Sequence, residues 1–190
     1  MVKKYFILLL LLLSVNVYAE ILVAPTRFDK QSDWNSFEQT IMSSKDQSDT
    51  ISWQGCGGKV TIAFQFETFI ADEISRGKLF NFVVSGPALS MHAFILCFFD
   101  NVTFSKGSFL MFHSLETTQT DCNGVTRSAR TLDDYDMRIF KVCREVGYVT
   151  NKDIRDFTVG KKEVYIKYSI DGKRLKSIEK PDTRPNGEGY

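Results

Sequence analysis

The chain has 190 residues, enough for one medium-sized domain and too few for two full ones. Hydrophobic residues make up 43% and charged residues 25%, which is ordinary globular composition and argues against long disorder or a polytopic membrane protein. The net charge of +1 argues against nucleic acid as the main partner, because phosphate binding requires a basic excess on one surface. His92 and His113 are the only histidines. A multi-histidine metal site is therefore nearly excluded, and we expect neither a metal nor a cofactor.

The first residues have the organisation of an export signal. Two lysines precede a leucine-rich apolar run at residues 5–13, and Val17 and Ala19 place small residues before a cut after Ala19. The run is shorter than the ~20 residues that span a bilayer, and the alternative is an uncleaved anchor. We expect residues 1–19 to be a cleaved signal peptide. The mature chain would then have a net charge of −1, no transmembrane segment and a periplasmic or secreted location.

Export would place the four cysteines in an oxidising compartment, where disulfides persist. Four cysteines allow three pairings, and the sequence does not choose among them. A bridge between Cys122 and Cys143 would close a loop of about 22 residues. Cys97 lies in an apolar run and is expected to be a buried thiol. Because none has a Cys-x-x-Cys partner, we interpret all four, Cys56 included, as structural.

The first part of the mature chain predicts a helix and a strand. Residues 29–50 are polar, but Trp34, Phe37 and Ile41 recur at helical spacing and predict a short amphipathic helix. Residues 50–53 are a short strand candidate that leads into a glycine-rich turn.

The glycine-rich turn at residues 55–58 precedes a helix predicted over residues 60–75, which Gly77 ends. The apolar stripe of this helix is broad, so we expect it to be covered on most sides. The stripe comprises Val60, Ala63, Phe64, Ile70, Ala71 and Ile74, and Ile62, Phe66 and Phe69 broaden it.

Two compact apolar runs, at residues 79–84 and 109–112, lack polar alternation and are typical of strands buried in a parallel sheet. A turn is predicted at residues 85–87. Apolar and polar residues alternate over residues 164–170 and predict a hairpin strand.

Strands that alternate with helices indicate an α/β architecture. We expect a single domain over residues 20–180 and a flexible tail over residues 181–190, which contains two prolines and two glycines.

Ser90 comes after the strand predicted at residues 79–84, and a helix is predicted to begin near this serine. A serine at such a turn faces outward beside free helix N–H groups, although a simple helix cap is the alternative. His92 would project about 200° away from Ser90 on a helix and cannot easily take its proton. His113 is the last residue of a predicted strand, and open α/β sheets bind ligands at the carboxyl ends of their strands. If Ser90 pairs with a histidine, the geometry therefore allows His113. The N–H groups of Gly58 and Met91 would form an oxyanion hole, unless the glycines form an ordinary turn.

Three segments resemble the proteolytic subunit of Clp protease. They are the Gly-Gly turn at residues 57–58, the sequence Gly-Pro-Ala-Leu-Ser-Met-His-Ala-Phe at residues 86–94, and the apolar run at residues 109–113 that ends in histidine. Their order and approximate separation agree over about sixty residues. The resemblance implies a Clp-protease/crotonase-like ββα superhelix and a homo-oligomer. It also implies that Ser90 is the nucleophile, His113 the general base, and the Gly58 and Met91 amides the oxyanion hole.

The resemblance also implies an aspartate as the third member of a Ser-His-Asp catalytic triad, and the sequence indicates its position less clearly. Laying the Arg-Asp-Phe sequence over the family's downstream segment nominates Asp156, with Asp153 as the close alternative. Its task would be to accept a hydrogen bond from the second ring nitrogen of the histidine. Either aspartate can instead be a solvated charge. Leu89 and His92 are bulkier than the usual neighbours of this nucleophile, and we expect both near the mouth of the substrate site.

These observations predict an exported serine peptidase that hydrolyses peptides or unfolded protein without a cytosolic ATPase. The alternative is a non-catalytic periplasmic binding or assembly protein, in which His113 would lie beyond hydrogen-bond reach of Ser90. A third interpretation, a crotonase-like enzyme acting on an acyl thioester, is disfavoured by export away from cytosolic coenzyme A.

Overall fold

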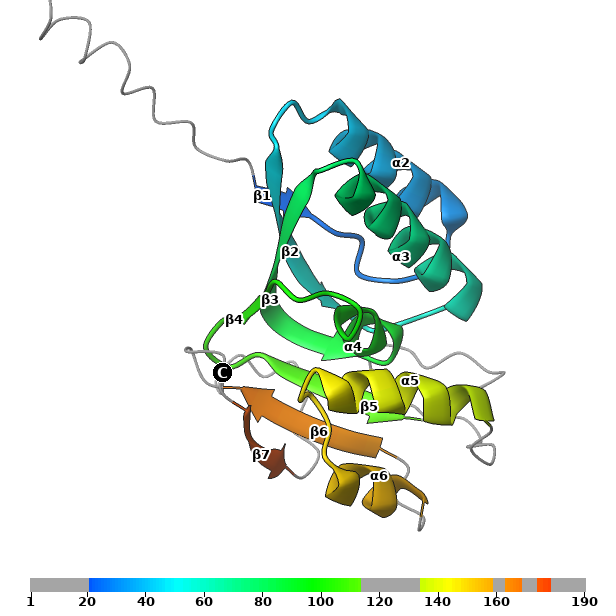
Figure 1. The fold of residues 1–190 in the computed structure, drawn as a ribbon, viewed down its shortest axis with the longest axis vertical. Coiled ribbons are helices and arrows are strands. Elements are labelled where there is room, and N and C mark those ends of the chain that lie inside the picture. Colours follow the sequence, from blue (N-terminus) through cyan, green and yellow to red (C-terminus); the bar gives the residue numbers. More distant parts are fainter. Residues whose placement is uncertain (1–20, 114–133, 159–162, 169–173, 179–190) are drawn as a thin grey trace, which may run out of the picture.

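The computed structural model describes residues 21–113, 134–158, 163–168 and 174–178. The predicted signal peptide with its cut site, and the predicted tail, lie outside these residues. The described chain is a mixed α/β structure in which helices pack on a largely parallel sheet (Figure 1). In chain order its elements are β1 (Ile21–Val23), α2 (Gln31–Ser43), β2 (Ser48–Gly55), α3 (Val60–Ser75), β3 (Leu79–Leu89), α4 (Met91–Leu96), β4 (Val102–Phe104), β5 (Phe109–His113), α5 (Asp134–Glu145), α6 (Asn151–Thr158), β6 (Glu163–Tyr168) and β7 (Arg174–Ile178).

The sheet has the strand order β1-β2-β3-β5-β6-β7, with β4 also paired to β3. Strands β1, β2, β3 and β5 run parallel, and β6 and β7 are antiparallel to their neighbours. The antiparallel pairing of β6 with β7 confirms the predicted hairpin. Because β2, β3 and β5 are parallel neighbours, their carboxyl ends meet at one edge of the sheet.

Strand β3 is longer than the sequence predicts, and the expected turn at residues 85–87 is wrong. The strand continues through Gly86 and Pro87 to Leu89. Its first part pairs with β4 at residues 82–84, and its last part pairs with β5 from Pro87 onward. The glycine and proline therefore mark a change of strand partner instead of a reversal of the chain. An added Cβ on Gly86 would collide with the side chain of Gln54 on β2.

Helix α2 confirms its prediction, because Trp34, Phe37 and Ile41 are its buried residues. Helix α3 has the predicted bounds, and Gly77 follows it with a φ of +93°. The predicted stripe of α3 is partly wrong, since Ile74 is 46% exposed. The buried residues of α3 are Ile62, Ala63, Phe66 and Ile70, and all four belong to the broadened stripe.

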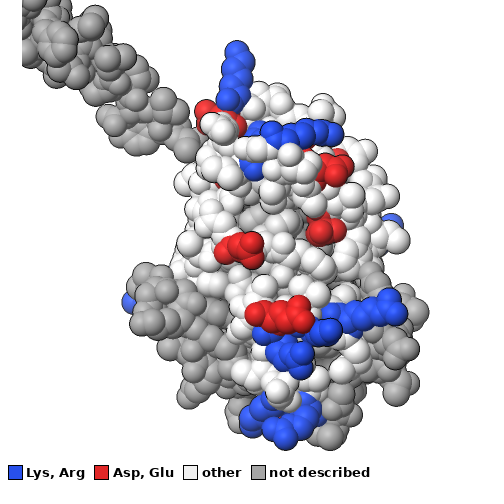
Figure 2. Space-filling view, in the orientation of Figure 1, with Lys and Arg blue, Asp and Glu red and all other residues white. Residues whose placement is uncertain are grey.

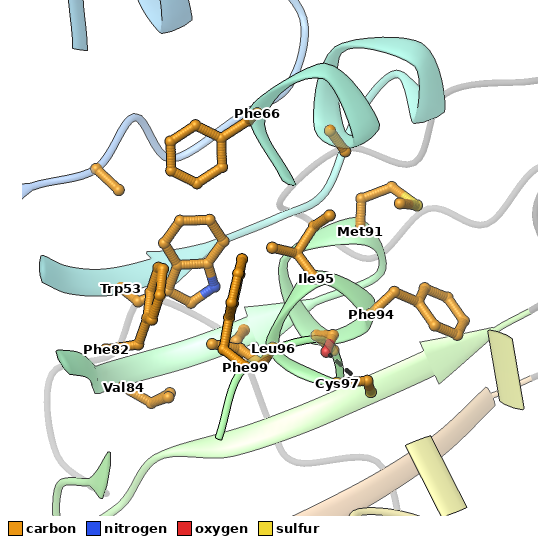
Figure 3. Packing of buried hydrophobic residues seen from close by; sticks show 14 of the residues in the cluster. Trp53, Phe66, Phe82, Val84, Met91, Phe94, Ile95, Leu96, Cys97 and Phe99 are labelled. Carbon is orange, nitrogen blue, oxygen red and sulfur yellow. Dashed lines mark hydrogen bonds between the residues drawn. The ribbon is translucent and has the colours of Figure 1, made fainter. Parts of the chain in front are cut away.

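Contacts between aromatic rings join β2, α3, β3 and the segment after α4. The Trp53 ring of β2 stacks on Phe66 of α3 with centroids 5.8 Å apart, and Phe82 of β3 stacks on Phe99 at 4.6 Å (Figure 3). Trp53 also meets Phe82 edge to face. Each such pair contributes about 0.5–1.5 kcal/mol beyond its area burial. These contacts fix the end of β2 and the first half of β3 against α3 and the segment after α4.

A disulfide joins Cys97, which follows α4, to Cys143 of α5. The expectation that Cys97 is a buried thiol is therefore wrong. Its burial is as predicted, but the buried face of α5 brings a second cysteine against it, beside Phe140, whose ring meets Phe94 of α4 at 5.5 Å. Cys56 is also disulfide-bonded.

Within the residues that the structure describes, no helix is both long and apolar enough to cross a membrane.

Candidate active site

Three candidate site features lie at the carboxyl ends of β2, β3 and β5, at one edge of the sheet. The Gly57-Gly58 turn follows β2, Ser90 follows β3, and His113 is the last residue of β5. These strands are neighbours in the sheet, so the two turns and the histidine lie side by side. In open α/β sheets this edge is where ligands bind.

The backbone of Ser90 has an unusual conformation, with φ 55° and ψ −124°. Ser90 is the only non-glycine residue with a positive φ in the described segments. Such a conformation costs of order 1–3 kcal/mol and persists only where surrounding contacts impose it. Here the Ser90 N–H donates to the Met111 carbonyl at 2.8 Å, while the Ser90 carbonyl accepts from the Ala93 and Phe94 amides at the start of α4.

The Ser90 hydroxyl does not cap α4. Its Oγ instead lies 2.7 Å from Nε2 of His113, a hydrogen-bond distance. Both residues are buried, with Ser90 6% and His113 4% exposed, so little water competes for this bond. The capping alternative is thereby excluded as the reason for a serine here, because the hydroxyl is committed to the imidazole.

His113 shares a face of β5 with Phe109 and Met111, since side chains alternate along a strand. These two residues and Leu89 of β3 form a small apolar cluster separate from the main core. The neighbouring residues Leu110 and Phe112 belong to the main core. The imidazole is thus presented on an apolar surface at the end of the strand.

The Gly57 backbone lies directly against Ser90. A Cβ built on Gly57 would be 2.5 Å from Ser90 Cβ and 2.9 Å from its Oγ, closer than real Cβ atoms approach. The φ of Gly57, +87°, is also one that side chains disfavour. Only glycine therefore permits this turn to touch the serine.

The direction of the Gly58 N–H follows from its neighbours. The Phe28 N–H donates to the Gly57 carbonyl at 2.7 Å, and the peptide is trans, so the Gly58 N–H points away from Phe28. Met91 is the first residue of α4, and its N–H has no acceptor within the helix. Among the described residues neither amide has a hydrogen-bond acceptor. No residue in the described ranges therefore prevents these two donors from binding an anion.

His92 is not at a substrate mouth, contrary to expectation. It is fully buried, and its Nδ1 accepts a hydrogen bond from the Gly57 N–H at 3.0 Å. Its Nε2 lies 3.0 Å from the Pro25 carbonyl. Burial lowers the pKa of His92 to about 4, and the bond to Pro25 opposes this shift only in part. Sequence reasoning missed this role because both partners lie far from His92 in the chain.

The described contacts of the two candidate aspartates lie within or next to α6. Asp153 Oδ2 accepts from the N–H of Thr150 at 2.7 Å and from its hydroxyl at 2.6 Å, and the Asp153 N–H lies 3.2 Å from that hydroxyl. This reciprocal arrangement is a capping box at the start of α6. Asp156 pairs with Lys152 at 2.7 Å. Asp153 thus caps α6, and both Asp156 and its alternative Asp153 stay predictions for the third member of the triad.

A pocket lies between α5 and α6. Lys and Arg gather on this part of the surface (Figure 2). The pocket contains no paired nucleophile and base. No group of three or more His, Cys, Asp or Glu side chains suited to a metal occurs in the part of the chain that the structure describes. The candidate chemistry is therefore concentrated at Ser90. The pocket is lined by Met137, Arg138, Lys141, Arg144, Asn151, Ile154 and Arg155.

No protein-family model matches the chain, and no curated protein matches it either. The interpretation of the site thus depends on its geometry.

Proposed function

We propose that the protein is an exported serine peptidase that hydrolyses peptides or unfolded protein. The observation that carries this proposal is the 2.7 Å contact between Ser90 Oγ and His113 Nε2 at a strained turn. Strained backbone conformations of this kind cluster at active sites, where they hold a reactive side chain in place.

The chemistry assigns one task to each group. With Nε2 of His113 unprotonated, the Ser90 hydroxyl donates to it, and the imidazole takes this proton as Oγ attacks the peptide carbonyl carbon. The carbonyl oxygen becomes an oxyanion that accepts from the Gly58 and Met91 amides. When the C–N bond breaks, His113 gives the proton to the leaving amine. Water then attacks the acyl-serine ester as His113 takes its proton, and His113 returns this proton to Ser90 Oγ as the acid is released.

Asp156 is our proposal for the residue that orients the imidazole. It would accept from the second ring nitrogen of His113 and stabilise the imidazolium formed during the reaction. Asp153 is the alternative; it is buried, and its Oδ2 accepts two hydrogen bonds from Thr150.

We further propose a Clp-protease/crotonase-like ββα superhelix, a homo-oligomeric assembly and a periplasmic or secreted location. The support for the fold is that the Gly-Gly turn, the serine and the histidine follow three adjacent parallel strands in the order that the family resemblance implies. The Cys97–Cys143 disulfide supports an oxidising compartment. Such a compartment offers no cytosolic ATPase, so substrates must arrive already unfolded or short.

The non-catalytic alternative predicts that His113 lies beyond reach of Ser90, and the observed 2.7 Å contact disfavours it. The discriminating experiment is hydrolysis of a labelled unfolded protein, without ATP, by the full chain recovered as exported. We expect Ser90→Ala and His113→Ala to lower turnover at least about 10³-fold. Ser85→Ala removes an exposed serine from β3 and should leave turnover unchanged. No hydrolysis by folded wild-type protein, or equal hydrolysis by Ser90→Ala, would contradict the proposal.

A further inference from the structure

The ring of His92, the second residue of α4, is enclosed by the protein. None of its surface is exposed. Three aromatic rings surround it, with centroids 4.6 Å away for Phe28, 5.0 Å for Trp53 and 6.1 Å for Trp34. Trp53 also donates its indole N–H to the His92 carbonyl at 2.8 Å. The imidazole therefore has one well-defined position.

The hydrogen bonds of this ring require a single protonation state. Nδ1 accepts from the Gly57 N–H, so Nδ1 carries no proton. The remaining ring proton must be on Nε2, which donates to the Pro25 carbonyl. His92 is thus neutral and joins α4 to two other segments, the Gly57-Gly58 turn and the chain just after β1.

The ring also fits tightly against the turn. A Cβ built on Gly55 would collide with Nε2 and Cε1 of His92, so the imidazole lies directly on the backbone. Two further bonds fix the same turn to the segment after β1. The Cys56 N–H donates to the Thr26 carbonyl at 2.9 Å, and the Lys59 N–H donates to the Phe28 carbonyl at 2.8 Å.

Together these bonds determine two successive peptide planes. His92 fixes the direction of the Gly57 N–H, and the Phe28 N–H fixes the Gly57 carbonyl. Because the peptide is trans, the second plane sets the direction of the Gly58 N–H, one of the two oxyanion donors. Glycines at φ +87° and +132° have wide conformational freedom, so without these bonds the donor would not be held in one orientation.

We propose that His92 is a positioning residue that holds the oxyanion turn against Ser90 through the bond from the Gly57 N–H to its Nδ1. The inference rests on the proposed function, because it assigns the turn its catalytic task. A residue that only filled the core would need no polar atoms here. An apolar side chain of similar size would leave the Gly57 N–H and the Pro25 carbonyl buried and unpaired.

Two amide substitutions separate the two hydrogen bonds of the ring. His92→Asn places an acceptor near the position of Nδ1, whereas His92→Gln places a donor near the position of Nε2. We expect His92→Asn to keep kcat within about tenfold of wild type, and His92→Gln to lose roughly 10²–10³ in kcat with KM little changed. Equal kcat values for the two variants at matched thermal stability would overturn the proposal.

A measurement without catalysis keeps the inference testable if the peptidase proposal fails. In ¹⁵N NMR spectra of the wild-type protein, we expect His92 to be neutral with its proton on Nε2 near pH 7. The Gly57 amide should exchange slowly with solvent in wild type and in His92→Asn, and faster in His92→Gln. A proton on Nδ1, or equal exchange of Gly57 in all three proteins, would overturn the positioning role whether or not Ser90 is reactive.

Discussion

The imidazole of His113 meets the hydroxyl of Ser90 at 2.7 Å across 23 positions of sequence. Two backbone features bring them together. The Ser90 N–H donates to the carbonyl of Met111, two residues before His113 on the same face of β5, and the φ of 55° turns the serine off the end of β3. The contact is therefore a property of the sheet register and of a strained turn, and both can be tested separately.

The strain at Ser90 predicts an unusual order of stability among its variants. Ser90→Gly should have a larger free energy of unfolding than Ser90→Ala, because glycine adopts φ 55° without penalty and alanine does not. We expect a difference of about 1–3 kcal/mol, measured by chemical denaturation. At an unstrained position the order is the reverse, since glycine has the larger conformational entropy when unfolded. Ser90→Ala that is as stable as Ser90→Gly would show that the turn is relaxed.

The contact between Gly57 and Ser90 predicts a steric effect that is separable from backbone strain. Gly57→Ala should abolish hydrolysis and destabilise the fold, because its Cβ would overlap the serine side chain. Gly147→Ala is the matched control, since Gly147 has a φ of +84°, close to the +87° of Gly57, and nothing lies within 4 Å of its added Cβ. Activity and unfolding curves of both variants measure the effect. Similar losses in both would mean that proximity to Ser90 is irrelevant.

The buried neutral state of His92 predicts a pH dependence of stability. Burial lowers the pKa of His92 in the folded protein to about 4, whereas a histidine in the unfolded chain has its ordinary pKa of about 6.5, so between these pH values only the unfolded chain takes up the proton. The free energy of unfolding should therefore fall as the pH is lowered from 6.5 to 4, by up to about 3 kcal/mol, with no further loss from this group below pH 4.

Denaturant unfolding of wild type and His92→Asn at several pH values from 4 to 7 measures this contribution. Carboxylates contribute equally to both proteins, so the difference between the two curves isolates His92. Parallel curves would contradict the assignment of a neutral histidine.

The two aspartates predict different defects. Asp156→Asn should lower kcat strongly, by up to about 10⁴-fold, while leaving the unfolding transition nearly unchanged, because an amide fails to hold the required histidine tautomer. Asp153→Asn should instead destabilise α6 by about 1 kcal/mol through its capping box. Lys152→Ala controls for the exposed ion pair of Asp156. Full activity in Asp156→Asn would remove it from the triad.

Local patterns in the sequence predicted the parts of the fold that depend on neighbouring residues. The bounds of α3 followed from its apolar residues and from Gly77, and the end of β5 followed from an unbroken apolar run before His113. The pairing of Ser90 with His113 was predictable once both strand ends were placed, because strand ends in a parallel sheet share an edge.

Features that depend on distant partners were not predictable in this way. Strand β3 passes through Gly86 and Pro87 because it exchanges β4 for β5, which no local pattern indicates. The partner of His92 at Pro25 lies 67 positions away, and Cys97 bonds to a cysteine 46 positions away. Such contacts are set by packing of the whole domain.

The most direct test of the central claim is covalent labelling of Ser90 by a fluorophosphonate probe. The probe reacts with a serine only when a base activates its hydroxyl, and it needs no knowledge of the natural substrate. We predict one adduct per chain in the folded wild-type protein, mapped to Ser90 by peptide mass spectrometry and absent from folded Ser90→Ala and His113→Ala. A folded wild-type protein that stays unlabelled, or an adduct that persists in Ser90→Ala, would contradict the account.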